Sequence, residues 1–158
     1  MDEPSRLKVA LQKSGRLTDF SIDLLVRCGL KFSRGKDQLV AFGENMPLDL
    51  LFVRDDDIPD LVEEDVCDLG LVGLNVVAEK SLEIAAKGHP TKFEILRALE
   101  FGRCRLSIAV PENFRYDGVR SLAGQRIATT YPYLLGKFLT DNDIKAEIVT
   151  LSGAVEIA

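Results

Sequence analysis

The sequence contains a single histidine, no tryptophan and only three cysteines among its 158 residues. One histidine excludes a multi-histidine metal site, and a Ser-His-Asp or Cys-His catalytic arrangement would depend on that residue alone. This residue, His89, stands beside a proline in a polar stretch, where we expect a solvent-exposed side chain. Cys28, Cys67 and Cys104 are widely spaced among apolar residues, which predicts reduced, mostly buried thiols.

Long apolar runs and clusters of positive charge are also lacking. No stretch approaches the roughly 18 apolar residues that a membrane span requires, and the first residues do not resemble a signal peptide, so we expect a cytoplasmic protein. A net charge of −5 without a basic run disfavours nucleic-acid binding. Hydrophobic residues at 46% and charged residues at 28% indicate a globular chain.

Alternating and near-continuous apolar runs predict short strands, because alternation suits a half-buried strand and a continuous run suits one covered on both faces. We predict strands over residues 7–11, 48–53, 67–73, 93–96, 105–110, 126–129 and 146–151, and a hairpin or irregular pair within 32–42. Amphipathic segments predict helices over 20–28, 58–64, 134–139 and around 76–79, with a further helix start at 152–153. Successive strand–loop–helix units predict a mostly parallel α/β sheet.

The residues at the predicted helix ends have side chains that such positions favour. Thr18 or Ser21 can cap the first helix, and Gly29 can end it. Asp57 can cap the second helix, with Pro59 in its first turn. The two strands expected within residues 93–110 could carry the chain from one lobe into another.

Two loops after predicted strands carry groups suited to phosphate chemistry, because ligands of open α/β sheets bind beyond the carboxyl ends of the strands. Lys13-Ser14-Gly15-Arg16 offers two cations and a glycine that lets the backbone approach an anion. An ordinary turn with solvated basic residues explains this loop about as well. Thr129-Thr130-Tyr131-Pro132 offers hydroxyls and amides that can hold a phosphate or only cap a helix.

Two further segments leave alternatives open. In Arg54-Asp55-Asp56-Asp57, consecutive carboxylates seldom converge on Mg²⁺, so we favour Asp57 as a helix cap beside two solvated aspartates. Arg54 follows a buried strand, where a charge calls for an anionic partner from a substrate or from the protein. The glycines of Asp68-Leu69-Gly70-Leu71-Val72-Gly73 either admit a flat base or allow close helix–strand packing.

Segments along nearly the whole chain together resemble the catalytic part of the ATP phosphoribosyltransferases, the family that opens histidine biosynthesis. The matching segments are, in chain order, residues 11–17, 44–47, 54–59, 68–73, 102–106, 126–132 and 152–156. Each segment alone is modest, and their order and spacing carry the resemblance. The Lys-Ser-Gly-Arg and Arg-Asp-Asp-Asp-Ile-Pro forms are more similar to the long, self-regulated branch than to the short branch that needs a partner subunit.

The resemblance implies an α/β, periplasmic-binding-protein-like fold of two lobes with mostly parallel sheets and the active site between the lobes. Residues 1–100 would form the first catalytic lobe and residues 101–158 an incomplete second lobe. The implied substrates are ATP and phosphoribosyl pyrophosphate, the products are phosphoribosyl-ATP and pyrophosphate, and the cofactor is Mg²⁺, with no metal ligands assigned. N1 of the adenine attacks C1 of the ribose, so catalysis depends on positioning and on stabilising the departing pyrophosphate.

The resemblance also implies roles for individual residues. Arg16 and Arg54 match family positions suited to that electrostatic task, and we expect them to be catalytic. The remaining expected contacts to ATP or phosphoribosyl pyrophosphate are Lys13, Gly15, Asp68, Gly73, Cys104, Thr130, Tyr131 and Glu156, the last beside the phosphoribosyl pyrophosphate site.

Several parts of the family pattern have no counterpart in the chain. It ends before a Thr-Gly-x-Thr-Leu loop that cradles the 5′-phosphate, before the segment that returns to the first lobe, and before the C-terminal domain that binds histidine as feedback inhibitor. We therefore expect a chain that does not turn over by itself and that histidine inhibits only through the absent domain. For the full-length family the resemblance implies a homo-oligomer, with no nucleic-acid or membrane partner.

The residues alone leave open two hypotheses about function from other classes of protein. A ligand-binding or sensing domain can share the two-lobed fold without catalysis, and binding without bond formation would distinguish it. A nucleotide-binding structural subunit of a larger assembly would instead require a partner chain for stability or activity.

Overall fold

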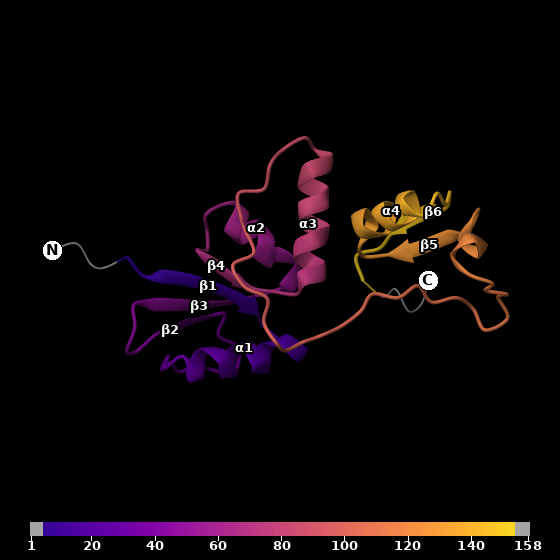
Figure 1. Ribbon diagram of the computed structural model, residues 1–158. Coiled ribbons are helices and arrows are strands. Elements are labelled where there is room, and N and C mark those ends of the chain that lie inside the picture. The colour runs from indigo at the N-terminus through magenta and orange to yellow at the C-terminus, as the bar shows by residue number, and fades with distance from the viewer. Residues whose placement is uncertain (1–4, 154–158) are drawn as a thin grey trace.

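The computed structural model describes residues 5–153, and a four-stranded sheet organises the first half of the chain (Figure 1). The strand order is β2-β3-β1-β4, and β1 pairs in parallel with both β3 and β4. Only the edge strand β2 is antiparallel, on β3. The strands are β1 (Leu7–Gln12), β2 (Val40–Phe42), β3 (Leu48–Val53) and β4 (Leu69–Leu71). The predicted α/β class with a mostly parallel sheet is therefore confirmed.

Helices cover both faces of this sheet (Figure 1). On one face α1 (Arg16–Arg27) packs over Leu11, Leu50 and Phe52, whose side chains are fully buried. On the other face lie α2 (Ile58–Glu63) and α3 (Leu74–Ala86), with Ala10 and Ile58 in a second core. Neighbouring residues of β1 thus serve opposite cores, as the two-residue period of a strand requires.

The first helix begins one turn earlier than predicted, at Arg16 rather than Phe20. Thr18 and Ser21 are therefore not caps, and both are buried inside the helix. The Thr18 hydroxyl donates a hydrogen bond to the carbonyl oxygen of Gln12 at 3.0 Å, which ties the helix to the end of β1. The early start leaves Phe20 half-exposed on the outer surface of the helix.

The predicted helix stop at Gly29 is confirmed. Gly29 has φ 93°, and its N–H bonds to the carbonyl oxygen of Val26. The N–H of Leu30 reaches back to the carbonyl oxygen of Leu25. This pair of bonds is the Schellman motif, which needs a left-handed residue at Gly29.

The chain after β3 makes a 3₁₀ turn, η1 (Asp55–Asp57), and then enters α2 with Pro59 in the first turn. Asp57 occupies the N-cap position as predicted, but its side chain makes no capping hydrogen bond. Gly70 of β4 lies so close to α2 that a Cβ there would stand 2.5 Å from Cγ2 of Ile58. Gly70 therefore serves close helix–strand packing, one of the two interpretations that the sequence left open.

The strands predicted over residues 93–96 and 105–110 are wrong, because residues 91–118 contain no helix or strand. The segment instead crosses as an extended connection between the two halves (Figure 1). A strand is stable only beside a partner strand, and no described strand pairs with this segment. Its alternating apolar residues consequently stay exposed, among them Leu96, Leu106 and Ile108.

A smaller sheet follows, in which β5 (Arg126–Thr129) pairs in parallel with β6 (Glu147–Thr150). The helix α4 (Pro132–Asp141) connects the two strands, and a short 3₁₀ helix, η2 (Val119–Leu122), precedes them. One core holds this unit together, formed by Leu122, Leu135, Leu139 and Ile144. The predicted helix beginning at 152–153 runs into residues outside the described part.

The cysteine prediction is only partly confirmed. Cys67 is buried against α2, and this burial raises the pKa of its thiol. Cys28 and Cys104 are exposed, contrary to prediction, because one ends α1 and the other lies in the connecting segment.

His89 is exposed as expected. Among the described residues, no helix is long and apolar enough to cross a membrane.

Candidate functional site

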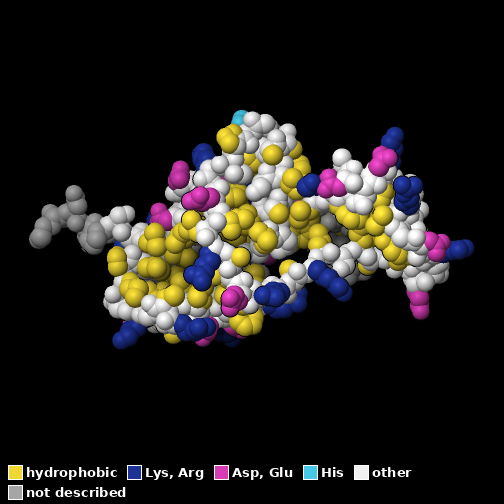
Figure 2. All heavy atoms as spheres, viewed as in Figure 1, with side chains coloured by type: hydrophobic (Ala, Val, Ile, Leu, Met, Phe, Trp, Pro, Cys, Tyr) yellow, Lys and Arg dark blue, Asp and Glu magenta, His cyan; other side chains and the backbone are white. Residues whose placement is uncertain are grey.

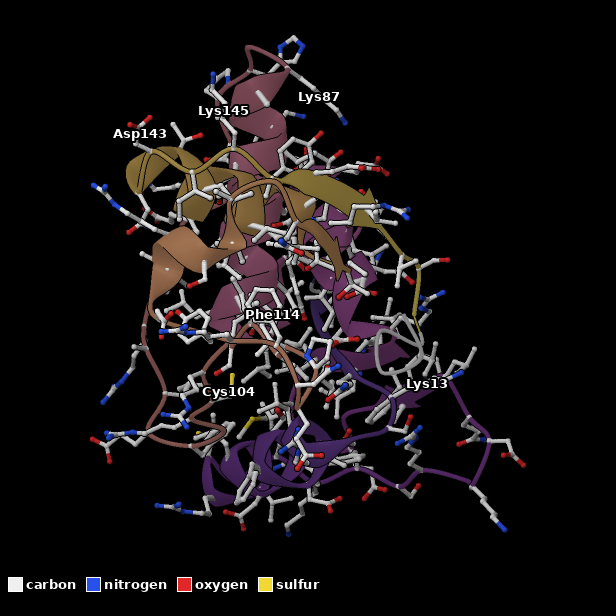
Figure 3. The ribbon with its side chains drawn as sticks, turned by 90° about the vertical axis from the view of Figure 1, so that its right-hand side faces the viewer. Lys13, Lys87, Cys104, Phe114, Asp143 and Lys145 are labelled. Carbon is white, nitrogen blue, oxygen red and sulfur yellow. The ribbon has the colours of Figure 1, made fainter. Side chains whose placement is uncertain are left out.

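The basic loop 13–16 begins where β1 ends, at the carboxyl edge of the first sheet. The N–H of Lys13 bonds to the carbonyl oxygen of Val53 at 2.8 Å, which holds this loop beside the end of β3. Arg16 opens α1, and its side chain and that of Lys13 are exposed. Figure 3 shows Lys13 at this edge. Two cations therefore stand at the strand ends, where an open α/β sheet binds its ligands.

Glycine is required within this loop at position 15. Gly15 has φ 125°, in a region that other residues rarely adopt. A Cβ there would lie 2.8 Å from Nε2 of Gln12. The loop can therefore turn sharply from β1 into α1 only without a side chain at this position.

Arg54 follows β3, the neighbour of β1, so it extends the basic edge. Its side chain is not enclosed: Arg54 is 66% exposed and its Nη2 lies 3.6 Å from Oδ2 of Asp56. Arg54 is thus not in the buried setting that the sequence suggested, and among the described residues its anionic partner is this loose ion pair with Asp56. Arg54 remains accessible to an anion from solution.

The loop after β4 brings the second sheet to the same edge. Gly73 precedes α3, and Asn75 in the first turn of α3 donates a hydrogen bond from Nδ2 to the hydroxyl oxygen of Tyr131 at 2.8 Å. Tyr131 belongs to the turn between β5 and α4. The N–H of Tyr131 is in turn bound by Oγ1 of Thr129 at 2.9 Å. The loop of Gly73 and the turn of Tyr131, which are far apart in sequence, are therefore linked through Asn75.

The environment of Tyr131 keeps its hydroxyl protonated. Burial raises the pKa of Tyr131, and the nearby carboxylates of Asp56 and Asp55 raise it further. The hydrogen bond from Asn75 lowers this pKa, but the net direction is upward. The pKa of Asp56 is itself raised, first by burial and then by Asp55, against the opposing effect of Arg54. Tyr131 is thus a neutral hydrogen-bonding group that lies near the acidic turn after β3.

Cys104 reaches this region by a different route, along the connecting segment. The segment packs on α1, where the rings of Phe20 and Phe101 stack with their centroids 5.5 Å apart. Gly102 lies so close to α1 that a Cβ would stand 2.2 Å from Cδ2 of Leu17. Figure 3 shows Cys104 on this segment, above α1. The Cys104 thiol is close enough to Tyr131 to contribute to its raised pKa.

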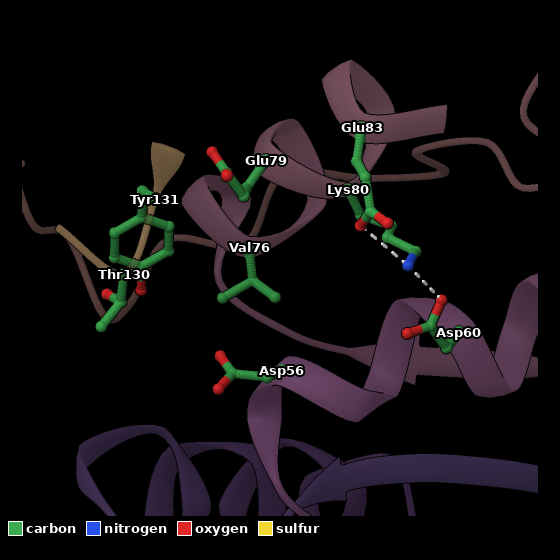
Figure 4. Close-up of a pocket in the computed structure, with 8 residues that line it drawn as sticks. All are labelled: Asp56, Asp60, Val76, Glu79, Lys80, Glu83, Thr130 and Tyr131. Atoms are coloured by element: carbon green, nitrogen blue, oxygen red, sulfur yellow. Dashed lines mark hydrogen bonds and ion pairs between the residues drawn. The ribbon is translucent and has the colours of Figure 1, made fainter. Parts of the chain in front are cut away.

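A pocket of about 230 Å³ lies between α3 and the turn that precedes α4 (Figure 4). Figure 4 shows Thr130 and Tyr131 at one end and the ion pair of Lys80 with Asp60 at the other. The lining residues are Asp56, Asp60, Val76, Glu79, Lys80, Glu83, Thr130 and Tyr131. Four carboxylates against one ammonium make this pocket acidic, so it does not suit a polyphosphate.

The amides at the start of α4 are already occupied. Both carboxylate oxygens of Glu79, on α3, accept hydrogen bonds from this helix, one from the N–H of Tyr133 at 2.8 Å and one from the N–H of Leu134 at 2.7 Å. The sequence left open whether these amides hold a phosphate. In the structure a carboxylate of the protein takes that place.

One of the expected site residues, Asp68, is not gathered with the others. Asp68 precedes β4, and its Oδ2 accepts a hydrogen bond from the N–H of Lys8 at 2.7 Å. Lys8 lies near the amino end of β1, roughly 16 Å along the strand from Lys13. Asp68 therefore stands at the opposite edge of the sheet. Glu156 lies outside the described residues.

Sequence reasoning missed Asn75 and Glu79, which make the direct hydrogen bonds between the halves. The signal was present, because the two residues stand four apart at the start of a helix and so share one face. Within residues 5–153, no three side chains among His, Cys, Asp and Glu cluster as metal ligands. The arrangement can bind an anion at its basic edge and a neutral group beside Tyr131.

Comparison with known protein families gives a match to a family model. The model described as HisG, ATP phosphoribosyltransferase, matches residues 54–158. The ATP phosphoribosyltransferase of Xylella fastidiosa strain M12 is 49% identical over 153 residues, and that of Stenotrophomonas maltophilia strain R551-3 is 48% identical. Each comparison covers 97% of this chain and 50% of the relative. The chain thus spans about half the length of these relatives.

A solved structure is also similar, the ATP phosphoribosyl transferase (HisG:HisZ) complex from Thermotoga maritima. The TM-score is 0.69 with 25% sequence identity, covering 96% of this chain and 67% of that one. The likeness confirms the predicted periplasmic-binding-protein-like α/β class, of which this chain forms a part. Because nearly the same stretch covers a smaller share of the Xylella relatives, those relatives are longer than the Thermotoga chain.

Proposed function

The chain belongs to the ATP phosphoribosyltransferase family, and from this premise we propose that it forms the nucleotide-binding part of an enzyme that transfers the phosphoribosyl group of phosphoribosyl pyrophosphate to ATP and releases pyrophosphate. The observation that carries the proposal is that three strand-end loops share one edge of the first sheet, while Asn75, just after the third of them, binds Tyr131 of the second sheet. Loops 13–16, 54–57 and 72–73 follow the adjacent parallel strands β1, β3 and β4, and the turn with Tyr131 faces them from the second sheet.

The reaction that we propose forms one bond and breaks another. N1 of the adenine attacks C1 of the ribose, the bond from C1 to the pyrophosphate oxygen breaks, and its electron pair leaves with pyrophosphate. The adenine nitrogen supplies the electron pair itself, so the chain needs no activated serine or cysteine. What the protein must supply is orientation and positive charge near the leaving group.

Charge divides the proposed site into two parts. The phosphate groups go to the basic edge, where Lys13, Arg16 and Arg54 are accessible and Arg54 makes only a loose ion pair among residues 5–153. Arg16 and Arg54 are the proposed catalytic pair, because a guanidinium can bind two phosphate oxygens at once. The acidic pocket repels phosphate, so the uncharged base and ribose go toward Tyr131.

The other expected contacts differ in how close they lie to the proposed site. We propose Gly15 and Gly73 as backbone contacts on the phosphate side, and Thr130, Tyr131 and Cys104 as contacts on the other side of the site. Asp68 lies at the far edge of the sheet and accepts a hydrogen bond from the backbone N–H of Lys8, so we propose no direct contact with the substrates for it. A role for Glu156 beside phosphoribosyl pyrophosphate stays a prediction, as do the boundary at residue 100 and a cytoplasmic location.

Enzymes of this family use a metal ion. We propose Mg²⁺ as that ion, which proteins commonly hold with one or two carboxylates together with substrate phosphates. The described residues do not form a metal site by themselves. We therefore assign the ion to the polyphosphates of the substrates and derive no step from a metal held by this chain.

The length of the relatives supports the long, self-regulated branch, as the loop sequences do. For the full-length enzymes of this family we propose a homo-oligomer that histidine inhibits through a C-terminal domain. The HisG:HisZ assembly is a property of the Thermotoga protein.

Isothermal titration calorimetry with ATP tests the proposal. We expect weak binding to this chain, and we expect Arg16→Ala to weaken it about tenfold or more, since a hydrogen bond to a charged group contributes about 1.5–3 kcal/mol. Arg126→Ala is the matched control, because Arg126 is exposed on β5 and pairs with Glu147. Absence of ATP binding by the folded chain, or equal losses in both variants, would contradict the proposal.

A second titration, with phosphoribosyl pyrophosphate, separates the two half-sites. We expect it to bind much more weakly than to a full-length relative, and we expect the mixture of both substrates to give no product. Robust product formation by this chain would overturn the view that it cannot turn over by itself.

A further inference from the structure

Glu79 is an acidic residue of α3 whose carboxylate is bound by a different half of the molecule. Its two oxygens accept the N–H groups of Tyr133 and Leu134, at 2.8 and 2.7 Å. We infer that Glu79 is a positioning residue, an internal anion that fixes the start of α4, and with it Tyr131, against α3.

The bonding of α4 explains why a carboxylate is needed there. The first N–H groups of an α-helix have no carbonyl partner within the helix. The N-cap residue of α4, Tyr131, provides no side-chain capping bond, and Pro132 at the first helical position has no N–H. Tyr133 and Leu134 are therefore the first free donors, and Glu79 satisfies both. A negative charge at this end is also favoured by the helix dipole.

The partners of the neighbouring acidic residue show that this contact is particular to Glu79. Glu83 lies one turn further along α3 and lines the same pocket, but its carboxylate is bound by Lys80 and Lys87. In the part of the chain that the structure describes, Glu79 has no such cation. The start of α4 is what balances its charge.

A second contact adds another point of attachment between α3 and the turn before α4. We call the two contacts together the joint between the sheets. Asn75, one turn before Glu79 on α3, binds the Tyr131 hydroxyl at 2.8 Å. The two contacts lie before and after Pro132 in the sequence. They therefore hold the turn 129–134 at two points, which prevents its rotation about a single contact. While Glu79 is bound, the amides of Tyr133 and Leu134 are closed to any phosphate, and a ligand at this turn must use Thr130 or Tyr131 instead.

Amide hydrogen exchange measured by NMR tests the inference on the chain itself. Because Tyr133 and Leu134 have no partner within α4, their protection depends on Glu79. We expect Glu79→Ala to speed exchange at these two amides about tenfold, the size of a lost helix cap. Glu79→Gln keeps an acceptor oxygen without the charge, so we expect it to restore part of the protection.

Two internal references control this measurement. The N–H of Leu135 bonds to the carbonyl oxygen of Tyr131, so its exchange reports whether α4 is still folded. Glu83→Ala removes the same charge from α3 without touching α4, and we expect Tyr133 and Leu134 to keep their wild-type exchange. If Glu79→Ala does not fold, the comparison between Glu79→Gln and Glu83→Gln decides in its place.

Residual dipolar couplings give the orientation of the two sheets. We expect one orientation in the wild type and in Glu83→Ala, and averaged couplings for β5 and β6 in Glu79→Ala. Unchanged protection at Tyr133 and Leu134, or an unchanged orientation of the sheets, would overturn the inference. No substrate enters these measurements, so their result does not depend on the proposed function.

Discussion

The two sheets of this molecule differ in how fully each is enclosed. The sheet β2-β3-β1-β4 has helices on both faces, with Leu11, Leu50 and Phe52 in one core and Ala10 and Ile58 in the other, all fully buried. The sheet β5-β6 has two strands and one core, whose buried members keep 2% to 7% of their surface exposed, against 0% to 3% in the two cores of the larger sheet. Figure 2 shows the two parts as separate bodies that meet at a narrow contact.

This difference assigns different parts to the two sheets in the proposed site. The larger sheet fixes the basic edge by its own hydrogen-bond ladder, so Lys13 and Arg54 need no outside support. The smaller sheet places Tyr131 with the help of Asn75 and Glu79 from α3. A two-layer core buries more apolar surface and is more stable than a single small one.

The largest expected effect comes from emptying the two cores in turn. Leu50→Ala leaves a cavity in the enclosed core, and we expect a loss of about 3–5 kcal/mol in the free energy of unfolding. Leu135→Ala leaves a cavity in the smaller core. We expect a loss of about 2–3 kcal/mol in the free energy of unfolding, because the surrounding side chains can relax into the space. Urea denaturation followed by amide signals of each sheet checks both. Equal losses spread over both sheets would show that the two parts fold as one unit.

A matched pair of glycines gives changes of opposite sign. Gly70→Ala places a methyl group 2.5 Å from Cγ2 of Ile58, so we expect a loss of about 1–3 kcal/mol from overpacking. Gly136→Ala in α4 meets only Cδ1 of Ile148 at 3.7 Å, and we expect a gain of up to about 1 kcal/mol from helix propensity. Thermal unfolding measures both variants. A stabilising Gly70→Ala would disprove the close packing of α2 on β4.

A smaller effect is expected at the joint between the sheets. Tyr131→Phe leaves Nδ2 of Asn75 without its acceptor, and we expect a loss of about 0.5–1.5 kcal/mol. Tyr133→Phe is the control, since Tyr133 contacts α3 through its backbone N–H and its ring is partly exposed. Chemical denaturation compares the two variants. If Tyr133→Phe costs as much as Tyr131→Phe, the hydroxyl of Tyr131 contributes nothing particular to the joint.

The smallest effect concerns pH and the ion pairs of α3. Hydrogen bonds from Lys87 and Lys80 lower the pKa of Glu83. Its ionised form therefore stabilises the fold, fully above the ordinary glutamate value of 4.5 and progressively less as pH falls through the lowered pKa. We expect the stability difference between wild type and Glu83→Gln to shrink on acidification below pH 4.5. A difference that grows at low pH would reverse the sign of this contribution.

Local patterns predicted the parts of the fold that local forces decide. The apolar run 48–53 and the stop at Gly29 follow from burial and from backbone geometry, and both are present in the structure. The strands expected over 93–96 and 105–110 depend on a partner strand, which a local pattern cannot supply. The start of α1 was missed because its N-cap is Gly15, which offers no capping side chain for a local pattern to detect.

The same distinction holds for the candidate site. Lys13, Arg16 and Arg54 could be placed at one edge from the sequence, since the ends of parallel strands meet there. The spacing of Asn75 and Glu79 shows that they share one face of α3, but their contact with the turn of Tyr131 depends on how the second sheet sits on α3, which a local pattern does not give. Asp68 looked like a site residue in its motif, but its place before β4 puts it at the far edge.

The central claim is that both sheets contribute to one nucleotide site. An NMR titration of the chain with ATP tests it most directly, with the amides of Ser14 and Gly15 reporting on the first sheet and that of Tyr131 on the second. We predict that all three signals shift together and give the same dissociation constant, and that Arg16→Ala weakens the shifts at Tyr131 as well. Shifts confined to one sheet, or different constants for the two, would contradict the account.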